Sequence, residues 1–155
     1  MNMPDPLTMA SEPYRILLVE DDPGDVLITS EALEAGPLHH ELDVVGNGEE
    51  AIAYLRQQGR FVDASTPHLV LLDLNLPRVD GREVLAEIKG DAELCTVPII
   101  VLTTSDAEAD VLGTYALHAN AYITKPVDFE RFHEVVRQID DFFLKVVRLP
   151  NRAGR

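Results

Sequence analysis

Three carboxylates follow apolar runs in this chain, at positions where buried strands would end. The segment LVLLDLNLP, residues 69–77, places Asp73 after four apolar residues, and ILLVEDD places Glu20 and Asp21 after four others. An unbroken apolar run indicates a strand that is buried on both faces, as in parallel sheets covered by helices. Because such sheets bind ligands just outside the carboxyl ends of their strands, we expect these carboxylates to form one acidic pocket.

The chemistry that this pocket predicts is phosphoryl transfer assisted by a divalent cation. Carboxylates this close repel one another, and Mg²⁺ relieves the repulsion while it keeps several waters and binds phosphate oxygens. Two further apolar runs end at Thr103 and Lys125, which supply a hydroxyl and an ammonium group. Cations that face the equatorial phosphoryl oxygens catalyse such a transfer, so Mg²⁺ and Lys125 suit it. The proline after Lys125 would also allow a cis peptide bond.

These residues need a framework of alternating strands and helices. The apolar pattern predicts strands at 15–20, 42–46, 69–73, 98–103 and 121–124. Helices are expected at 23–35, 48–58, 81–89, 106–118 and 128–147, and a loop is expected at 59–67. Five βα units predict an α/β, doubly wound, five-stranded parallel sheet with helices on both faces. The first and third strands of such a sheet are neighbours, which brings Asp73 close to Glu20 and Asp21.

Composition limits the class of protein. The 155 residues suffice for one domain, and we expect a flexible leader at 1–13, the folded domain at 14–147 and a tail at 148–155. A single cysteine, Cys95, cannot form an internal disulfide, which favours a cytoplasmic protein. The net charge of −14 argues against direct binding to nucleic acid or to an anionic membrane. The apolar runs are too short to cross a bilayer, and the first residues lack the features of an export signal.

The chain resembles the receiver domains of two-component response regulators over residues 14–145. This resemblance implies a flavodoxin-like receiver fold with strand order 2-1-3-4-5, and it implies that Asp73 is the phosphoacceptor. The resemblance also assigns roles to the surrounding residues: Glu20, Asp21, Asp73 and the backbone carbonyl of Asn75 as metal ligands, Thr103 and Lys125 as catalytic groups, and Thr103 and Tyr122 as the switch. Glu20 stands where an aspartate is commoner in this family.

Four segments resemble most closely the stand-alone regulators that are paired with bacterial and cyanobacterial phytochromes: PHLVLLDLNLP, DGREVLAEIK, VPIIVLTTS and ANAYITKPV. This closer match implies a sensor histidine kinase as phosphodonor, with bacteriophytochromes among the candidate kinases. The chain would then carry an aspartyl phosphate on Asp73 and would not be a turnover enzyme. Thr103 would move toward the phosphoryl group, and Tyr122 would turn from an exposed to a buried position.

The readout of phosphorylation is expected to be a protein contact, because no output domain is expected after residue 147. One apolar stripe of the last expected helix should be buried: Phe132, Val136, Ile139 and Phe143. Three other apolar residues lie off this stripe and form the candidate dimer face: Val135, Phe142 and Val146. A two-fold homodimer would use the fourth helix, the fifth strand and the fifth helix. Alternatively, the three residues only pack beneath the preceding helix.

Other functions stay open on the sequence alone. A haloacid-dehalogenase-like phosphatase also uses an aspartate after an apolar strand, but its second acid would stand at the position of Asn75. A flavodoxin-like cofactor carrier would need a Ser-, Thr- or Gly-rich loop where this chain has EDDPGD. A receiver that has lost phosphorylation could act only as a docking module. Each residue also has a plain structural interpretation, in which Asp21 and Asp22 cap a helix and Lys125 is a solvated charge.

Overall fold

In the described part of the chain, five parallel strands alternate with five α-helices. The computed structural model describes residues 13–36, 40–105 and 107–146, without the side chains of 144–146. The strands are β1 (Tyr14–Val19), β2 (His40–Val45), β3 (Leu69–Leu72), β4 (Ile99–Thr103) and β5 (Ala121–Thr124). The helices are α1 (Pro23–Glu34), α2 (Gly48–Leu55), α3 (Gly81–Lys89), α4 (Glu108–Ala116) and α5 (Phe129–Ile139), with a 3-10 turn η1 (Gly59–Phe61) and a π-helical segment η2 (Asp140–Val146). The strand order β2-β1-β3-β4-β5 confirms the predicted doubly wound fold.

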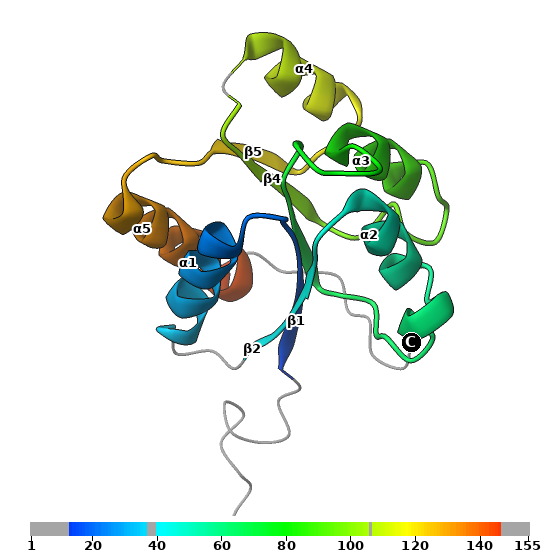
Figure 1. Ribbon diagram of the computed structural model, residues 1–155, viewed down its shortest axis with the longest axis horizontal. Coiled ribbons are helices and arrows are strands. Elements are labelled where there is room, and N and C mark those ends of the chain that lie inside the picture. The colour runs from blue at the N-terminus through cyan, green and yellow to red at the C-terminus, as the bar shows by residue number, and fades with distance from the viewer. Residues whose placement is uncertain (1–12, 37–39, 106, 147–155) are drawn as a thin grey trace, which may run out of the picture.

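Alternate residues of the apolar strands build two separate cores. In β1, Ile16 and Leu18 belong to one core and Leu17 and Val19 to the other, as the two-residue period of a strand requires. Figure 1 shows α1 and α5 together on one side of the sheet, and α2 and α3 on the other. Both faces are therefore covered, which explains why the central strands are apolar throughout. The predicted stripe of α5 is confirmed, because Phe132, Val136 and Ile139 are buried and Phe143 packs against the same core.

Side chains cap the starts of the first two helices. The side chain of Asp22 accepts hydrogen bonds from the backbone N–H groups of Gly24 and Asp25, and Pro23 opens α1. The side chain of Asn47 accepts from the N–H of Glu50 at the start of α2. These bonds satisfy donors that have no partner inside the first helical turn.

Helix ends differ more from the sequence prediction. The helix expected at 48–58 ends at Leu55, because Gln57 takes a left-handed conformation with φ of 56° and its side chain donates to the carbonyl of Ala64 at 2.5 Å. The turn η1 then occupies part of the expected loop. The helix expected at 106–118 is shorter at both ends, since Ala107 offers no side-chain cap and His118 has a φ of 71°.

The helix expected at 128–147 divides into α5 and η2. The junction lies at Asp140, a fully buried carboxylate that accepts from His40 Nε2 at 2.7 Å and from Arg137 at 2.8 Å. These contacts tie the end of α5 to the start of β2, which a local helix pattern cannot foresee. The cis peptide bond that Lys125 and Pro126 would allow is not formed, since the described residues contain none.

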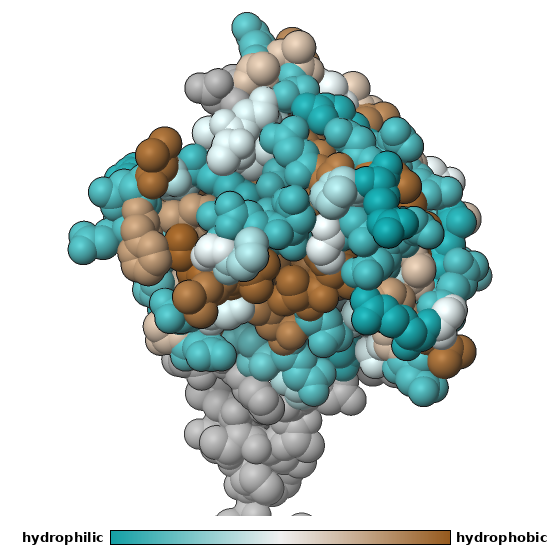
Figure 2. All heavy atoms as spheres, viewed as in Figure 1, coloured by the Kyte–Doolittle hydropathy of each residue, from teal (hydrophilic) through white to brown (hydrophobic). Residues whose placement is uncertain are grey.

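The edge strand β2 leaves apolar surface open. Val44 is 41% exposed, and together with Leu33 and Leu42 it lines a shallow groove between α1 and β2. Figure 2 shows apolar surface in the middle of this view, between α1 and α2. The exposed acids Glu41 and Asp43 flank Leu42 in this strand, and such charges protect an edge from pairing with another strand. Among the described helices, none is both long and apolar enough to span a membrane.

Gly81 allows the backbone to fold closely beneath the strand end that carries Asp73. Its N–H donates to the carbonyl of Leu74 at 2.9 Å, and a Cβ on Gly81 would lie 2.6 Å from the Leu74 Cα. Backbone atoms on both sides cannot move apart without breaking this hydrogen bond. A side chain at the start of α3 would therefore force this backbone contact apart.

We predict that Gly81→Ala destabilises the protein by about 1–3 kcal/mol, the usual cost of overpacking. The matched control is Gly113→Ala in α4, where a Cβ would meet nothing within 4 Å. This second change should stabilise by up to about 1 kcal/mol, because glycine is unfavourable inside a helix. Urea unfolding measures both, and a stable Gly81→Ala protein would show that the contact is not limiting.

Candidate functional site

Three residues of the acidic pocket lie one position beyond a strand and continue its hydrogen bonding. The backbone N–H groups of Glu20, Asp73 and Lys125 donate to carbonyls of the neighbouring strands at 3.0, 3.1 and 2.7 Å. The strand order places the ends of β1 and β3 side by side. The sheet thus fixes the backbone of each residue while its side chain extends past the carboxyl edge, where sites of this architecture lie.

The acids meet as the sequence predicts. One carboxylate oxygen from each of Glu20, Asp21 and Asp73 lies within 4.8 Å of the others. Glu20 and Asp73 are buried and Asp21 is exposed. Asn75 adjoins them, because its N–H donates to Asp73 Oδ1 at 3.2 Å. Clustered carboxylate oxygens that open to solvent at one corner fit a hard divalent cation.

Lys125 joins the pocket from the far side of β4. Its side chain is buried, and its Nζ donates to Glu20 Oε1, to Asp25 Oδ2 at 2.8 Å and to Asp73 Oδ2 at 2.9 Å. A lysine ammonium has three N–H donors and no acceptor, so these carboxylates can take all of its hydrogen bonds. The interpretation of Lys125 as a solvated surface charge is therefore wrong.

Burial and ion pairing set the charges of the pocket. Burial raises the pKa of Glu20 to about 7, although Lys125 acts against this shift. Burial also acts to raise the pKa of Asp73, but the hydrogen bond and the charge of Lys125 outweigh it and hold this pKa below its ordinary value. The pKa of Lys125 is raised, because its three carboxylate partners outweigh the effect of burial. At neutral pH, Asp73 is ionised and Lys125 is charged.

Thr103 ends β4, so its hydroxyl lies between the ends of β3 and β5. The residue is fully buried, and its Oγ1 has no hydrogen-bond partner in the described part of the chain. The hydroxyl is close enough to Asp73 to act with Lys125 in lowering the pKa of that carboxyl, although no hydrogen bond of normal geometry joins the two side chains. A buried hydroxyl without a partner is unfavourable, so this one is suited to an incoming oxygen-rich group.

Tyr122 lies outside the acidic pocket. The residue is half-buried, whereas the sequence predicts an exposed ring before activation. Its hydroxyl donates to the carbonyl of Ser105 at 2.6 Å, and its backbone N–H donates to the hydroxyl of Tyr115 on α4 at 3.2 Å. Tyr122 therefore links β5 to the loop that follows Thr103.

A polar network continues from this loop to α3 and α4. The Ser105 hydroxyl donates to Asp110 at 2.5 Å, and the Arg82 guanidinium pairs with Asp110 at 2.7 Å and with Asp80 at 3.1 Å. The pKa of Asp110 is lowered, chiefly by the Ser105 hydrogen bond and then by Arg82. No spacing in the sequence marks these residues, because they come from separate elements.

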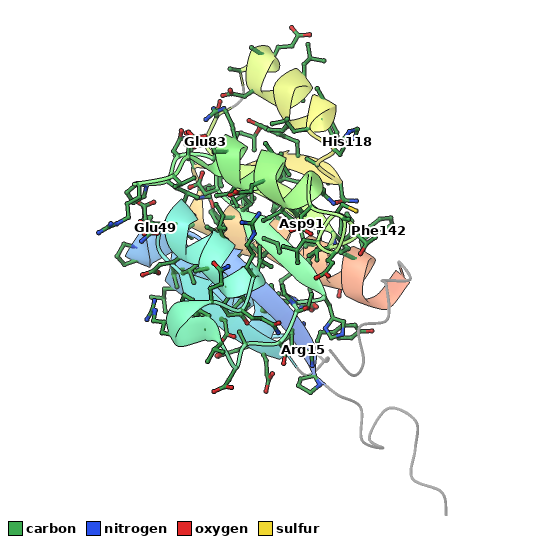
Figure 3. All side chains as sticks on the ribbon, turned by 90° about the vertical axis from the view of Figure 1, so that its right-hand side faces the viewer. Arg15, Glu49, Glu83, Asp91, His118 and Phe142 are labelled. Carbon is green, nitrogen blue, oxygen red and sulfur yellow. The ribbon has the colours of Figure 1, made fainter. Side chains whose placement is uncertain are left out.

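The candidate dimer face is divided in the structure. Val135 is half-buried and packs against the core between α1 and α5. Phe142 is 53% exposed and meets Phe143 edge to face at 5.3 Å. Figure 3 places Phe142 on the opposite side of that view from Glu49. The side chain of Val146 lies outside the described residues.

Asp25 is the pocket residue that the sequence does not single out. It stands in the first turn of α1, where an acid is ordinary, and its contact with Lys125 spans 100 positions of the chain. Its spacing from Asp21 is no signal either, because Asp21 precedes the N-cap Asp22 and lies outside α1. The structure thus adds a fourth carboxylate to the three that the strand ends predict.

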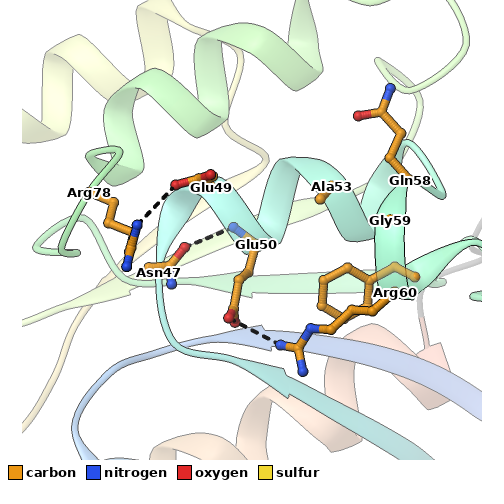
Figure 4. Close-up of a pocket in the computed structure, with 9 residues that line it drawn as sticks. Asn47, Glu49, Glu50, Ala53, Gln58, Gly59, Arg60 and Arg78 are labelled. Carbon is orange, nitrogen blue, oxygen red and sulfur yellow. Dashed lines mark hydrogen bonds and ion pairs between the residues drawn. The ribbon is translucent and has the colours of Figure 1, made fainter.

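A separate hollow lies at the start of α2 (Figure 4). Its two arginines are exposed and each pairs with a glutamate, Arg60 with Glu50 at 3.1 Å and Arg78 with Glu49 at 3.4 Å. None of the residues of the acidic pocket lines it. The hollow is therefore separate from the acidic pocket.

Comparison with known proteins agrees with the geometry. Response regulator Rcp1 of Synechocystis sp. is 45% identical over 141 residues, which are 91% of this chain and 96% of Rcp1. The structure of the phosphorylated cyanobacterial phytochrome response regulator RcpA matches with a TM-score of 0.88 and 46% identity, over 90% of this chain and 100% of RcpA. The Mn²⁺-bound form of Rcp1 matches with a TM-score of 0.87 and 45% identity, over the same shares.

The family match covers the whole pocket. Residues 16–137 match the response regulator receiver domain, a range that includes the strand ends from Glu20 to Lys125. The predicted fold and strand order agree with this assignment. The chain therefore belongs to the response regulator receiver domain family.

Proposed function

We propose that this chain is a stand-alone response regulator that accepts a phosphoryl group on Asp73 from a sensor histidine kinase. The observation that carries the proposal is the buried, ionised carboxylate of Asp73, 2.9 Å from the buried ammonium of Lys125 and beside two further acids. The likeness to Rcp1 and to RcpA supports a phytochrome as the kinase, because RcpA is a phosphorylated phytochrome response regulator. The protein would act in the cytoplasm, where ATP can supply the phosphoryl group to the kinase.

The chemical step is a transfer between two nucleophiles. A carboxylate oxygen of Asp73 attacks the phosphorus of a phosphohistidine, so that a P–O bond forms while the P–N bond breaks. The imidazole leaves with the electron pair of the broken bond. Lys125 then donates to an oxygen of the acyl phosphate, and Thr103 has a hydroxyl free to do the same. The chain receives one phosphoryl group and is proposed not to be a turnover enzyme.

Mg²⁺ is the proposed cofactor. Glu20, Asp21, Asp73 and the backbone carbonyl of Asn75 would hold it, and it would neutralise charge on the phosphoryl oxygens. All of these donors are oxygen atoms, which is the ligand set that hard cations prefer. The Mn²⁺-bound form of Rcp1 supports a divalent cation in a related protein. A haloacid-dehalogenase-like phosphatase is not favoured, because the chain belongs to the receiver family and Asn75 replaces the second acid.

The proposed signal is a change at the loop after β4. Movement of Thr103 toward the phosphoryl group would pull on Ser105, whose carbonyl holds the Tyr122 hydroxyl. The helix α4 is suited to respond, because Thr114 is its single buried residue in the described chain. It is held instead by polar contacts through Asp110 and Tyr115. An element with few buried apolar contacts moves at low cost.

Asp73→Asn should abolish phosphorylation. An asparagine amide is not a nucleophile toward phosphohistidine, so incubation with a phosphorylated kinase or with phosphoramidate should give no acid-labile, hydroxylamine-sensitive phosphate. Mass spectrometry and labelling measure the product. Removal of divalent cations with EDTA should stop labelling of the unchanged protein as well.

The control for this test is Asp128→Asn, which alters an exposed helix cap and removes the same charge. Because asparagine caps a helix as well as aspartate does, this variant should be labelled normally. Labelling of Asp73→Asn at an undiminished rate would refute Asp73 as the phosphoacceptor.

The switch predicts that phosphorylation moves two of the four tyrosine rings. Ring resonances of Tyr122 and of Tyr115 should shift in ¹³C NMR spectra, whereas those of Tyr14 and Tyr54 should stay. Thr103→Val keeps the shape of the side chain but removes its hydroxyl. This variant should still be labelled on Asp73, but its Tyr122 resonance should not move on phosphorylation. If the Tyr122 resonance moves as far as in the unchanged protein, the Thr103 hydroxyl is not part of the switch.

We also propose that the chain forms a homodimer that uses Phe142 of the candidate dimer face, which predicts that Phe142→Glu weakens self-association. A central aromatic residue contributes about 2 kcal/mol or more to an interface, so the dissociation constant of the dimer should rise roughly 30-fold. Val62→Glu is the control, because Val62 is 64% exposed and lies after η1, away from the proposed face. Sedimentation velocity measures the mass over a range of concentrations. Equal masses for both variants would exclude Phe142 from the interface.

A further inference from the structure

We infer that Asp25 is a positioning residue for Lys125, and that it holds the ammonium group in place while the other two carboxylates change partners. The inference rests on the proposed phosphorylation of Asp73. It assigns a role to a residue that lies outside both the phosphoacceptor and the proposed metal ligands.

Exposure separates Asp25 from the other two partners of Lys125. The distances do not, because Asp25 Oδ2 lies 2.8 Å and Asp73 Oδ2 lies 2.9 Å from Lys125 Nζ. The side chain of Asp25 is 23% exposed, so it closes the ammonium off from solvent at the mouth of the pocket. Lys125 is otherwise enclosed, with a side chain that is 3% exposed.

The three partners of Lys125 have different fates in the proposed reaction. Glu20 and Asp73 are proposed metal ligands, and Asp73 also loses its carboxylate charge when it becomes an acyl phosphate. Asp25 takes part in neither change. It is therefore the one carboxylate of the three that can pair with the ammonium before and after transfer, so that Lys125 needs to redirect only its remaining N–H groups.

The start of α1 shows that Asp25 is not needed as a cap. Asp22 already accepts from the N–H groups of Gly24 and Asp25. Within the described residues, the hydrogen bonds of the Lys125 ammonium go to Glu20, Asp25 and Asp73, and not to Asp22. A negative charge near the start of a helix interacts favourably with the helix dipole, but Asp22 and Asp25 both supply such a charge. The direction of the Asp25 side chain toward Lys125 is what distinguishes the two acids.

The experiment compares Asp25→Asn with Asp22→Asn. Both remove one negative charge from the same helical turn, and asparagine keeps the cap at position 22. In Asp25→Asn the Lys125 ammonium should exchange its protons with water about tenfold faster, as ¹⁵Nζ NMR of the metal-free protein measures. The rate of labelling by phosphoramidate at saturating Mg²⁺ should fall about tenfold, which corresponds to one hydrogen bond to a charged group. Asp22→Asn should stay within about twofold of the unchanged protein in both measurements.

Equal behaviour of the two variants in proton exchange and in labelling would overturn the inference, because only the loss of charge would then matter. Circular dichroism checks that both variants are folded, and the NMR measurement needs no phosphorylation. If the unchanged protein is not labelled on Asp73 at all, the proposed function fails, whereas normal labelling of Asp25→Asn refutes only the role of Asp25.

Discussion

Lys125 pairs with three carboxylates of the pocket, those of Glu20, Asp25 and Asp73, and the sheet is arranged so that this one ammonium can reach them. The strand β4 lies between β3 and β5, so the long side chain of Lys125 crosses the end of β4, above Thr103, to reach Asp73 and Glu20. Buried carboxylates without a counter-charge would take up protons. Loss of the lysine would therefore leave Asp73 a poorer nucleophile.

The same ammonium gives two neighbouring acids different properties. Asp73 has a lowered pKa, whereas burial leaves Glu20 with a pKa of about 7. One positive charge cannot balance the three close carboxyl groups of Glu20, Asp21 and Asp73, so the pocket has an excess of acidic groups. That imbalance is the physical reason for expecting a divalent cation, and the likeness to a Mn²⁺-binding relative agrees with it.

Much of this could be predicted from the sequence, because the strands are apolar on both faces and the site residues interrupt them. Asp73 and Lys125 are conspicuous for that reason. Asp25 is not, since an acid in the first turn of a helix needs no explanation and its partner is 100 positions away. The end of the last helix could not be predicted for a similar reason. The α5–η2 junction depends on a contact between His40 and Asp140, and such distant pairs leave no periodic signal in the sequence.

The link from the pocket to the surface follows from where hydrogen bonds are present and where they are missing. Thr103 has an unpaired buried hydroxyl, and two residues later Ser105 has both its carbonyl and its hydroxyl engaged, by Tyr122 and by Asp110. A phosphoryl oxygen that accepts from Thr103 would therefore act on a short, tightly bonded segment. Because α4 is attached mainly through Asp110 and Tyr115, a shift of that segment would be passed to the helix and would not be absorbed by an apolar core.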